Sequence, residues 1–242
     1  MLEKKIKGFL AFCVYALFGN MQCEGIQYTE KMGMRGVACE INDEIKKRIV
    51  GKSWDEKDIR CPKLSDLRYL IIPFLGYDNN INLGEMILHK DLAEEVLDIF
   101  QELLLTGNVR IEKMKLIDDY FKENETRYTV KNLNEIDSRS MKDNNTSAFF
   151  FRLKTLQNEL SNHALGLALD INTLENPFVK GDIVDPIEGT EYCDRTRTDV
   201  KGFITADGDC VKIFKKHGWA WGGDCFIGRQ DYQHFCKEPG QK

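Results

Sequence analysis

Ser161–Asp170, with the sequence SNHALGLALD, and two later segments decide how this chain folds and what it can bind. The later segments are GWAWGG at residues 218–223 and DYQHF at residues 231–235. Together they supply two imidazoles and one carboxylate as candidate ligands, which are His163, Asp170 and His234. Three nitrogen and oxygen ligands, with a fourth position left to water, are the ligand set of a catalytic zinc site. A spare carboxylate, Asp231, stands where a general base would be wanted.

The composition is that of an ordinary globular protein. The chain has 242 residues, of which 42% are hydrophobic and 30% are charged. This length fits one domain, or one domain with a sizeable subdomain, and is enough to bury a core. The formal net charge is −5, and no basic cluster is present in the sequence, so we do not expect a nucleic-acid partner.

The N-terminus has the pattern of a targeting segment. Three lysines precede an apolar run, Gly8–Phe18, which has the length of a signal-peptide core and is short for a membrane span. We therefore expect residues 1–22 to be a signal peptide and the protein to be exported. Cys23 follows closely and is a candidate for a lipid anchor. The alternative is an ordinary buried N-terminal helix.

The eight cysteines show no C-x-x-C spacing, which argues against a structural zinc knuckle. In an exported protein some of them could be bridged. The candidate pairs are Cys225 with Cys236, and Cys193 with Cys210. Reduced, buried thiols are the equal alternative.

The first half of the chain predicts two strands and a turn. Leu67–Leu75 is rich in strand-forming residues, and Pro73 should lie at an edge or a bulge. Residues 76–81 are turn material, and Glu85–His89 is the second predicted strand.

A helix is predicted from Leu92 to Leu105, because apolar residues recur there at helical spacing. Asp91 is its expected N-cap and Gly107 its C-terminal stop. Residues 111–117 alternate loosely and predict a strand, and residues 121–146 predict a long loop with some helix.

The second half predicts a strand over residues 165–172 and a helix over residues 209–217. In the strand, Leu169 and its alternate neighbours should point one way and Asp170 the other. Strands and helices alternate without a regular βαβ pattern. We therefore expect an α+β domain with a mainly antiparallel sheet flanked by helices.

The spacing of the candidate ligands sets two conditions. His163 and Asp170 are seven residues apart, an odd offset that puts them on opposite faces of an ideal strand. Both can reach one metal only if His163 lies on a turn before the strand. Asp231 and His234 are three apart and would share a side on a helical turn. The other two histidines, His89 and His217, are expected to be structural.

Taken together, these motifs resemble those of the M15-type peptidases. This family includes D-alanyl-D-alanine carboxypeptidases, dipeptidases and L-alanyl-D-glutamate endolysins. The matching patterns are S-x-H-x-x-G-x-A-x-D at 161–170, N-P-F-V at 176–179, G-W-x-W-G-G at 218–223 and D-Y-x-H-F at 231–235. Asn145–Phe149 with Arg152 also looks like the family's stretch before the first motif.

The resemblance implies roles for six residues. Zinc would be bound by His163, Asp170 and His234. Asp231 would be the general base that takes a proton from the zinc-bound water. Arg152 would stabilise the substrate carbonyl oxygen or its oxyanion, and Ser161 is a candidate for a hydrogen bond to substrate.

The resemblance also implies a fold like that of the hedgehog domain and the D-Ala-D-Ala peptidases. After the signal peptide, residues 23–140 would form the N-terminal part and residues 141–240 the zinc peptidase core.

The function expected from this resemblance is that of an exported zinc peptidase that cleaves the stem peptides of peptidoglycan. It would act in the periplasm or cell envelope, free or attached to a membrane through its N-terminal segment or Cys23. The main alternative is a non-catalytic zinc-binding recognition module of the envelope, although Asp231 argues against it because a pure binding site needs no base. A structural envelope protein that has lost the metal is the third possibility.

Overall fold

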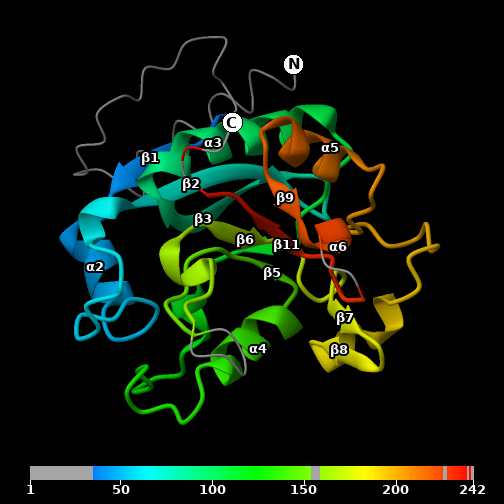
Figure 1. The fold of residues 1–242 in the computed structure, drawn as a ribbon. Coiled ribbons are helices and arrows are strands. Elements are labelled where there is room, and N and C mark those ends of the chain that lie inside the picture. Colours follow the sequence, from blue (N-terminus) through cyan, green and yellow to red (C-terminus); the bar gives the residue numbers. More distant parts are fainter. Residues whose placement is uncertain (1–34, 154–158, 226–227, 239, 241–242) are drawn as a thin grey trace.

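The computed structural model describes residues 35–153, 159–225, 228–238 and 240 (Figure 1). The predicted signal peptide and Cys23 lie outside the described residues. Within the described part, no helix combines the length and the apolar character that a bilayer crossing requires.

The helices of the described residues are short except for one. The α-helices are α2 (Asp43–Ile49), α3 (Lys90–Thr106), α4 (Asn134–Lys142), α5 (Asp209–Lys216) and α6 (Gly222–Cys225). The 3₁₀ turns are η1 (Leu64–Asp66), η2 (Ile117–Tyr120), η3 (His163–Leu165) and η4 (Ile187–Tyr192).

The strands form several small sheets. They are β1 (Val37–Glu40), β2 (Leu67–Leu75), β3 (Ile81–His89), β4 (Lys113–Met114), β5 (Asn145–Thr146), β6 (Ala168–Asp170), β7 (Phe178–Lys180), β8 (Ile183–Asp185), β9 (Ala220–Trp221), β10 (Gln230–Asp231) and β11 (His234–Cys236). The strand orders are β1-β2-β3, β10-β7-β8 and β6-β11-β9, all antiparallel, with a parallel pair β4-β5. The expected α+β class with mainly antiparallel pairing is confirmed.

Strands β2 and β3 form the longest hairpin, as the sequence predicts. Leu67 pairs with His89 and Leu75 with Ile81, so the turn lies between residues 75 and 81. Strand β1 pairs with β2 only as far as Ile71. Pro73 therefore lies beyond the end of β1, where its missing N–H costs no ladder hydrogen bond.

Helix α3 covers one face of this sheet, at the top of Figure 1. It begins at Lys90, two residues before the predicted start, and ends at Gly107, whose φ of 69° is left-handed. The predicted cap at Asp91 is wrong: the His89 side chain is the N-cap and accepts a hydrogen bond from the Asp91 N–H. The sequence did not reveal this because an imidazole nitrogen is a less usual cap than a carboxylate.

The layer under α3 and α5 extends from the first sheet to the short C-terminal strands. The N–H of His89 bonds to the Gly166 carbonyl, and the N–H of Phe149 bonds to the Ile87 carbonyl, so later segments run along the edge of β3. One apolar cluster joins α3 and α5 to β2, β3, β6, β9 and β11. Trp219 and Trp221 belong to this cluster and are 2% and 3% exposed, so both pack in the core.

Two segments in the middle of the chain differ from the sequence predictions. Residues 111–117 form only the short strand β4, which runs parallel to β5 and leads into η2. Residues 121–146, predicted as a long loop with some helix, contain α4 and also the short strand β5, which was not predicted. Ile136 of α4 packs with Phe150 in a separate small apolar cluster, and this long-range contact explains a helix that local spacing did not specify.

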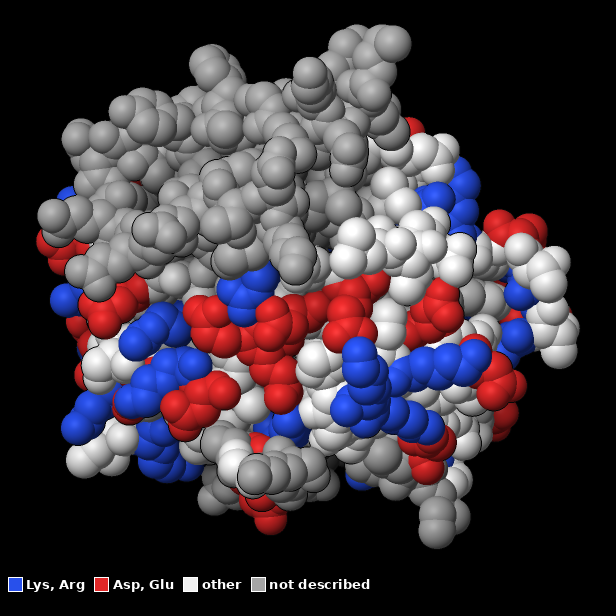
Figure 2. All heavy atoms as spheres, turned by 90° about the horizontal axis from the view of Figure 1, so that it is seen from above, with Lys and Arg blue, Asp and Glu red and all other residues white. Residues whose placement is uncertain are grey.

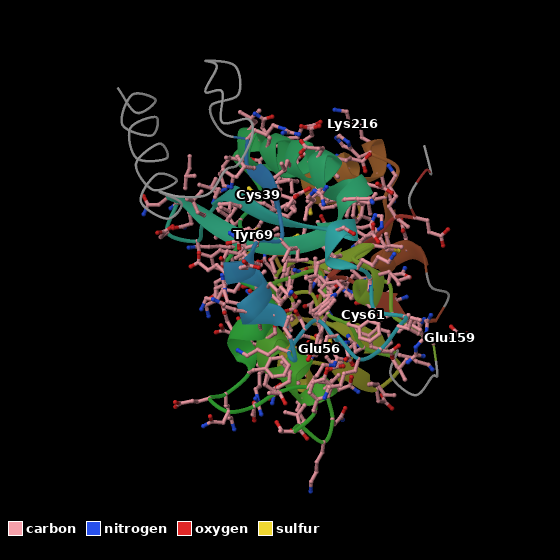
Figure 3. All side chains as sticks on the ribbon, turned by 90° about the vertical axis from the view of Figure 1, so that its left-hand side faces the viewer. Cys39, Glu56, Cys61, Tyr69, Glu159 and Lys216 are labelled. Atoms are coloured by element: carbon pink, nitrogen blue, oxygen red, sulfur yellow. The ribbon has the colours of Figure 1, made fainter. Side chains whose placement is uncertain are left out.

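Neither predicted disulfide forms. Cys193, Cys210 and Cys236 are free thiols, as is Cys61. Cys39 on β1 is disulfide-bonded. Figure 3 shows Cys39 at the first sheet and Cys61 in the loop below it.

The face over α3 carries opposite charges side by side. Figure 2 shows acidic side chains in a band bordered by basic ones. Arg35 pairs with Glu94 and Asp98, and Lys216 pairs with Glu102. These pairs are largely solvated, so each adds little stability.

A partly buried polar network holds the last strand onto α3. Lys237, directly after β11, donates to both carboxylate oxygens of Glu95, at 3.0 and 2.9 Å, and to the carbonyl of His217 at 2.7 Å. The indole N–H of Trp219 donates to the same carboxylate at 2.7 Å. The Lys237 side chain is 6% exposed, so its charge depends on this carboxylate.

We predict that Glu95→Ala lowers the free energy of unfolding by about 2–3 kcal/mol, because it leaves a buried ammonium without its counter-charge and a buried indole N–H without an acceptor. Glu94→Ala, which removes the exposed neighbour, is the matched control and should cost at most about 1 kcal/mol. Urea unfolding followed by circular dichroism measures both. Equal losses in the two variants would contradict the network's role.

Asp118 in η2 is a buried carboxyl, and none of the ion pairs between described residues includes it. It is 2% exposed, and its Oδ1 accepts a hydrogen bond from the Ser53 N–H at 2.9 Å. Burial raises the pKa of Asp118 to about 6. The unfolded chain has a carboxyl pKa near ~4, so between these values the native state binds more protons than the unfolded state. The contribution of Asp118 to stability therefore falls as the pH rises from about 4 to about 6.

We predict that Asp118→Asn becomes more stable relative to the wild type as the pH rises through this window, by up to about 3 kcal/mol. The neutral amide keeps an oxygen that accepts from Ser53 and avoids the cost of a buried charge. Urea unfolding at pH 4.5 and 7.5 measures the difference, with the exposed neighbour Asp119→Asn as control. A stability difference that does not change with pH would refute the account.

Candidate metal centre

The candidate centre is built on the antiparallel pairing of β6 with β11. His234 lies directly opposite Asp170, although the two are far apart in sequence. On the same two strands Phe235 lies opposite Leu169, and both are 0% exposed in the core beneath. Because side chains alternate across a strand, burying Phe235 and Leu169 turns His234 and Asp170 to the opposite face. The predicted alternation around Asp170 is thereby confirmed.

His163 lies on the turn before the strand, as its odd offset from Asp170 requires. It opens the 3₁₀ turn η3, which ends at Gly166 with a left-handed φ of 69°. A Cβ on Gly166 would also lie 2.6 Å from the main-chain nitrogen of His89. Both conditions explain why glycine occupies this motif position.

The ring of His163 is held from two sides. Ser161 Oγ accepts a hydrogen bond from the His163 main-chain N–H at 3.0 Å. The Ala148 carbonyl lies 2.7 Å from His163 Nδ1 and can only accept, so Nδ1 carries the proton. This fixes the tautomer and leaves the Nε2 lone pair of the neutral ring free as a ligand, the usual arrangement for a metal-binding histidine.

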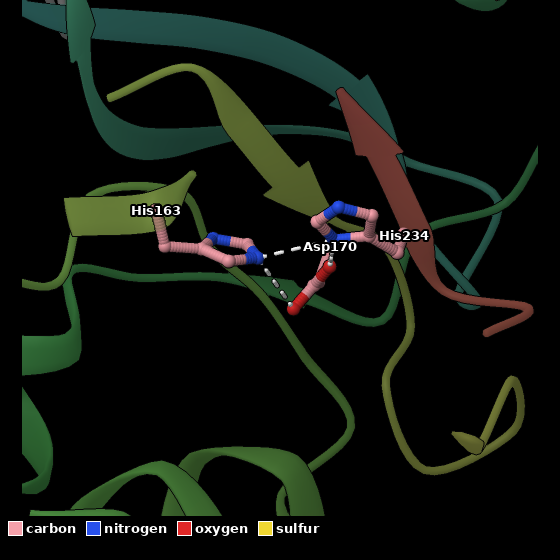
Figure 4. A group of neighbouring side chains, drawn as sticks. All are labelled: His163, Asp170 and His234. Carbon is pink, nitrogen blue, oxygen red and sulfur yellow. Dashed lines mark hydrogen bonds and ion pairs between the residues drawn. The ribbon is translucent and has the colours of Figure 1, made fainter. Parts of the chain in front are cut away.

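The three side chains converge on one point, as Figure 4 shows. His163 Nε2 lies 3.3 Å from Asp170 Oδ2 and 3.2 Å from His234 Nδ1, and His234 Nδ1 lies 3.0 Å from Asp170 Oδ1. One ligand atom of each lies within 4.8 Å of the other two. Two ring nitrogens and a carboxylate oxygen at these separations fit the donor set of zinc.

The electrostatics of the cluster favour a cation. Burial alone would raise the pKa of Asp170, but the adjacent His163 and His234 rings lower it well below its usual range. Burial would lower the pKa of His234, but its hydrogen bond to Asp170 raises it well above its usual range. The carboxylate thus attracts positive charge to the centre of the cluster, which a divalent cation would also supply.

Asp231 lies beside this cluster, but not on the helical turn that its spacing suggested. It ends β10, and the two-residue turn Tyr232–Gln233 leads into β11. A tight turn between strands also brings residues three apart close together. A Cβ on Gly222 would lie 2.8 Å from the Asp231 Cβ and 3.2 Å from the His234 Cβ, so both side chains flank this glycine.

The Asp231 carboxyl is buried beside the His–Asp–His cluster. Its Oδ1 is buried and has no hydrogen-bond partner among the described residues. Burial raises the pKa of Asp231, the nearby Asp170 raises it further, and the two imidazoles lower it. A buried acceptor without a donor in the protein is rare and points to a ligand or water as its partner.

The other two predicted site residues have defined contacts of their own. Arg152 Nη2 donates to Asp137 of α4 at 2.5 Å, and its buried Nε has no partner among the described residues. Ser161 is 7% exposed, and its hydroxyl positions His163. Their contacts with substrate stay predictions.

The remaining histidines lie outside the cluster. His89 caps α3, and His217 Nε2 lies 2.9 Å from a Glu102 carboxylate oxygen. Both have the structural surroundings that the sequence suggested.

The sequence analysis assigned no role to Asn176, the first residue of the N-P-F-V motif. This motif follows strand β6 and leads into strand β7. The amide nitrogen of Asn176 donates to the carbonyls of Asn172 and Gly202, at 3.0 and 2.8 Å. Its oxygen accepts from the Ile204 N–H and from Arg195, both at 2.8 Å. At 0% exposure only a side chain with both donors and an acceptor satisfies these groups. The motif itself was the signal that could have identified it.

Comparison with protein families gives one match, over residues 155–237, to a model described as D-alanyl-D-alanine carboxypeptidase. This segment matches the M15-type peptidases. The matched segment contains all four of the quoted motifs, so the resemblance seen in the sequence is confirmed for this segment. It supports a peptidase related to peptidoglycan. Searches of curated proteins and of solved structures returned no match.

We predict that Asp170→Asn weakens zinc binding by at least about 100-fold, because the substitution removes the only anionic ligand of the His163, Asp170 and His234 cluster. His217→Gln, which changes a histidine outside the cluster, should bind zinc like the wild type. Competition with a chromophoric chelator measures both affinities. Wild-type affinity in Asp170→Asn would show that zinc binds elsewhere.

Proposed function

We propose that this chain is an exported zinc metallopeptidase that hydrolyses a peptide bond in the stem peptides of peptidoglycan. The bond is either at a D-Ala-containing terminus or the L-Ala-D-Glu link. The observation that carries the proposal is the buried carboxylate of Asp231 beside a His–Asp–His cluster. The family match over the same segment supports the reaction class.

Zinc would be held by His163 Nε2, one Asp170 oxygen and His234 Nδ1. When bound, zinc lowers the pKa of water towards ~7 and polarises a carbonyl. The protein's contribution is the arrangement of the ligands. Ala148 fixes the tautomer of His163, and the β6–β11 register fixes Asp170 against His234.

Asp231 would take a proton from the attacking water and return it to the leaving amine. A carboxyl whose pKa is raised by burial is a stronger base than an exposed one, which suits this double role.

Arg152 would stabilise the charge that develops on the carbonyl oxygen. Its guanidinium already pairs with Asp137, while its buried Nε has an unused donor among the described contacts. A fixed cation directed at an oxyanion stabilises the transition state more than the substrate.

A non-catalytic zinc-binding recognition module is the alternative. Such a module would gain nothing from Asp231, because a buried carboxylate oxygen with no hydrogen-bond partner among the described residues destabilises the fold. The peptidase proposal explains this carboxylate, and the binding-module alternative does not.

Export is part of the proposal. Residues 1–22 have the charge and apolar pattern of a signal peptide. The disulfide at Cys39 supports an oxidising compartment such as the periplasm. Attachment to a membrane would depend on the N-terminal segment or on Cys23.

We predict that Asp231→Asn lowers the rate of muropeptide cleavage by about 100-fold or more, while zinc binding is kept. The assay uses purified muropeptides, zinc and product identification by mass spectrometry. Loss of a terminal alanine identifies a carboxypeptidase, and a cut between L-Ala and D-Glu identifies an endopeptidase.

Asp199→Asn, which changes an exposed carboxylate paired with Arg197, is the matched control and should cleave normally. A wild type that binds zinc and cuts nothing would favour the binding module. A fully active Asp231→Asn variant would remove Asp231 as the base.

A further inference from the structure

The long segment between β6 and α5 is organised around a half-buried cation, Arg195. Its Nη1 donates to the carbonyls of Glu175 and Tyr192, at 2.8 and 3.2 Å. Its Nη2 donates to Asn176 Oδ1 at 2.8 Å and to the Ile204 carbonyl at 2.9 Å. These acceptors are three main-chain carbonyls and one amide, so this charge is neutralised by dipoles. A half-buried cation in such surroundings is costly unless its geometry serves a purpose.

The guanidinium lies over two aromatic rings. Its central carbon is 3.8 Å from the centroid of Phe203 and 4.5 Å from that of Tyr232. A flat, delocalised cation can stack on two rings and still donate four hydrogen bonds at its edges. Arg195 therefore joins the segment before α5 to Tyr232.

Tyr232 begins the two-residue turn between Asp231 and His234. The turn is also held from the side of β9. The indole N–H of Trp221 donates to the Tyr232 carbonyl at 2.9 Å. Gly222 permits the close approach of Asp231, since a Cβ there would lie 2.5 Å from the Asp231 carbonyl oxygen. Trp221 and Gly222 hold the main chain of the turn, whereas Arg195 contacts the Tyr232 side chain.

We propose that Arg195 is a positioning residue for the reaction: stacked on Tyr232, it fixes the turn that sets the Asp231 carboxylate against the His–Asp–His cluster. The inference rests on the proposed peptidase function. Arg195 acts through Tyr232 and need not touch substrate. Removing the stack would let the turn move, and small displacements of a base relative to the water it activates can cost large factors in rate.

The kinetic test uses Arg195→Lys, Arg195→Gln, Tyr232→Leu and the double variant Arg195→Gln/Tyr232→Leu on purified muropeptides. We expect kcat to fall by about tenfold in each single variant, with KM and zinc affinity within about twofold of the wild type. The double variant should lose no more than the worse single variant, because both remove one shared contact. Arg195→Lys should have a higher thermal stability than Arg195→Gln, because lysine keeps the positive charge. Its kcat should stay as low, because an ammonium cannot stack on the Tyr232 ring as a planar guanidinium does.

Arg197→Ala is the matched control on the same segment. Arg197 forms an exposed pair with Asp199 at 2.7 Å, so its loss should leave kcat unchanged. An unchanged kcat in Arg195→Lys and Tyr232→Leu, or losses that multiply in the double variant, would overturn the proposal. If Arg195→Gln fails to fold, the kcat values of Tyr232→Leu and Arg195→Lys still decide the proposal.

A second measurement separates the inference from the peptidase function. Hydrogen–deuterium exchange of the peptide over residues 229–236 is compared between variants without substrate. We expect faster exchange in Arg195→Lys and Tyr232→Leu than in the wild type and Arg197→Ala. Unchanged exchange would overturn the positioning role even in an active enzyme. A wild type that cuts no muropeptide would instead refute the proposed function, while the exchange comparison still decides whether Arg195 holds the turn.

Discussion

The register of β6 against β11 is the constraint on which the rest of the site depends. A slip of one residue in β6 would turn Asp170 to the core face and Leu169 outward, and a slip in β11 would do the same to His234 and Phe235. The register is held by the apolar face, where Phe235 stacks on Phe214 of α5 with ring centroids 4.1 Å apart. The hydrophobic core thus specifies the position of two polar side chains that it does not contain.

Three sets of polar contacts hold the segments that flank β6 and β11. Lys237 and Glu95 fix the end of β11 to α3, Asn176 fixes the chain after β6, and Arg195 fixes the turn before β11. Each set is buried or partly buried, and each satisfies several groups at once, so losing one leaves partners unpaired. Rigid support of this kind suits a catalytic centre, where ligand and base must stay within a fraction of an ångström.

The sequence predicted the parts of this arrangement that depend on local pattern. The alternation around Asp170, the turn before it and the hairpin β2–β3 all follow from spacing within ten or so residues. The ligand set came from combining motifs, since neither histidine is informative alone. Asp231 was correctly placed near His234, but for the wrong reason, because a spacing of three fits a strand–turn–strand as well as a helix.

The missed features depend on contacts between distant segments. The roles of Asn176 and Arg195 arise only when residues 172–204 fold back onto β6 and Tyr232. No periodic pattern in the sequence predicts these contacts. The cap at His89 and the position of α4, within a segment predicted as a loop with some helix, were also decided by neighbours and not by propensity. Cysteine spacing could not exclude the two bridges that the structure lacks.

X-ray absorption at the zinc edge of the zinc-loaded full chain tests the central claim most directly. The account predicts a first shell of nitrogen and oxygen at about 2.0–2.1 Å, with the outer-shell signature of two imidazoles, that is lost in His163→Ala. A sulfur shell at about 2.3 Å would show that cysteines hold the metal and would contradict the His163, Asp170 and His234 centre.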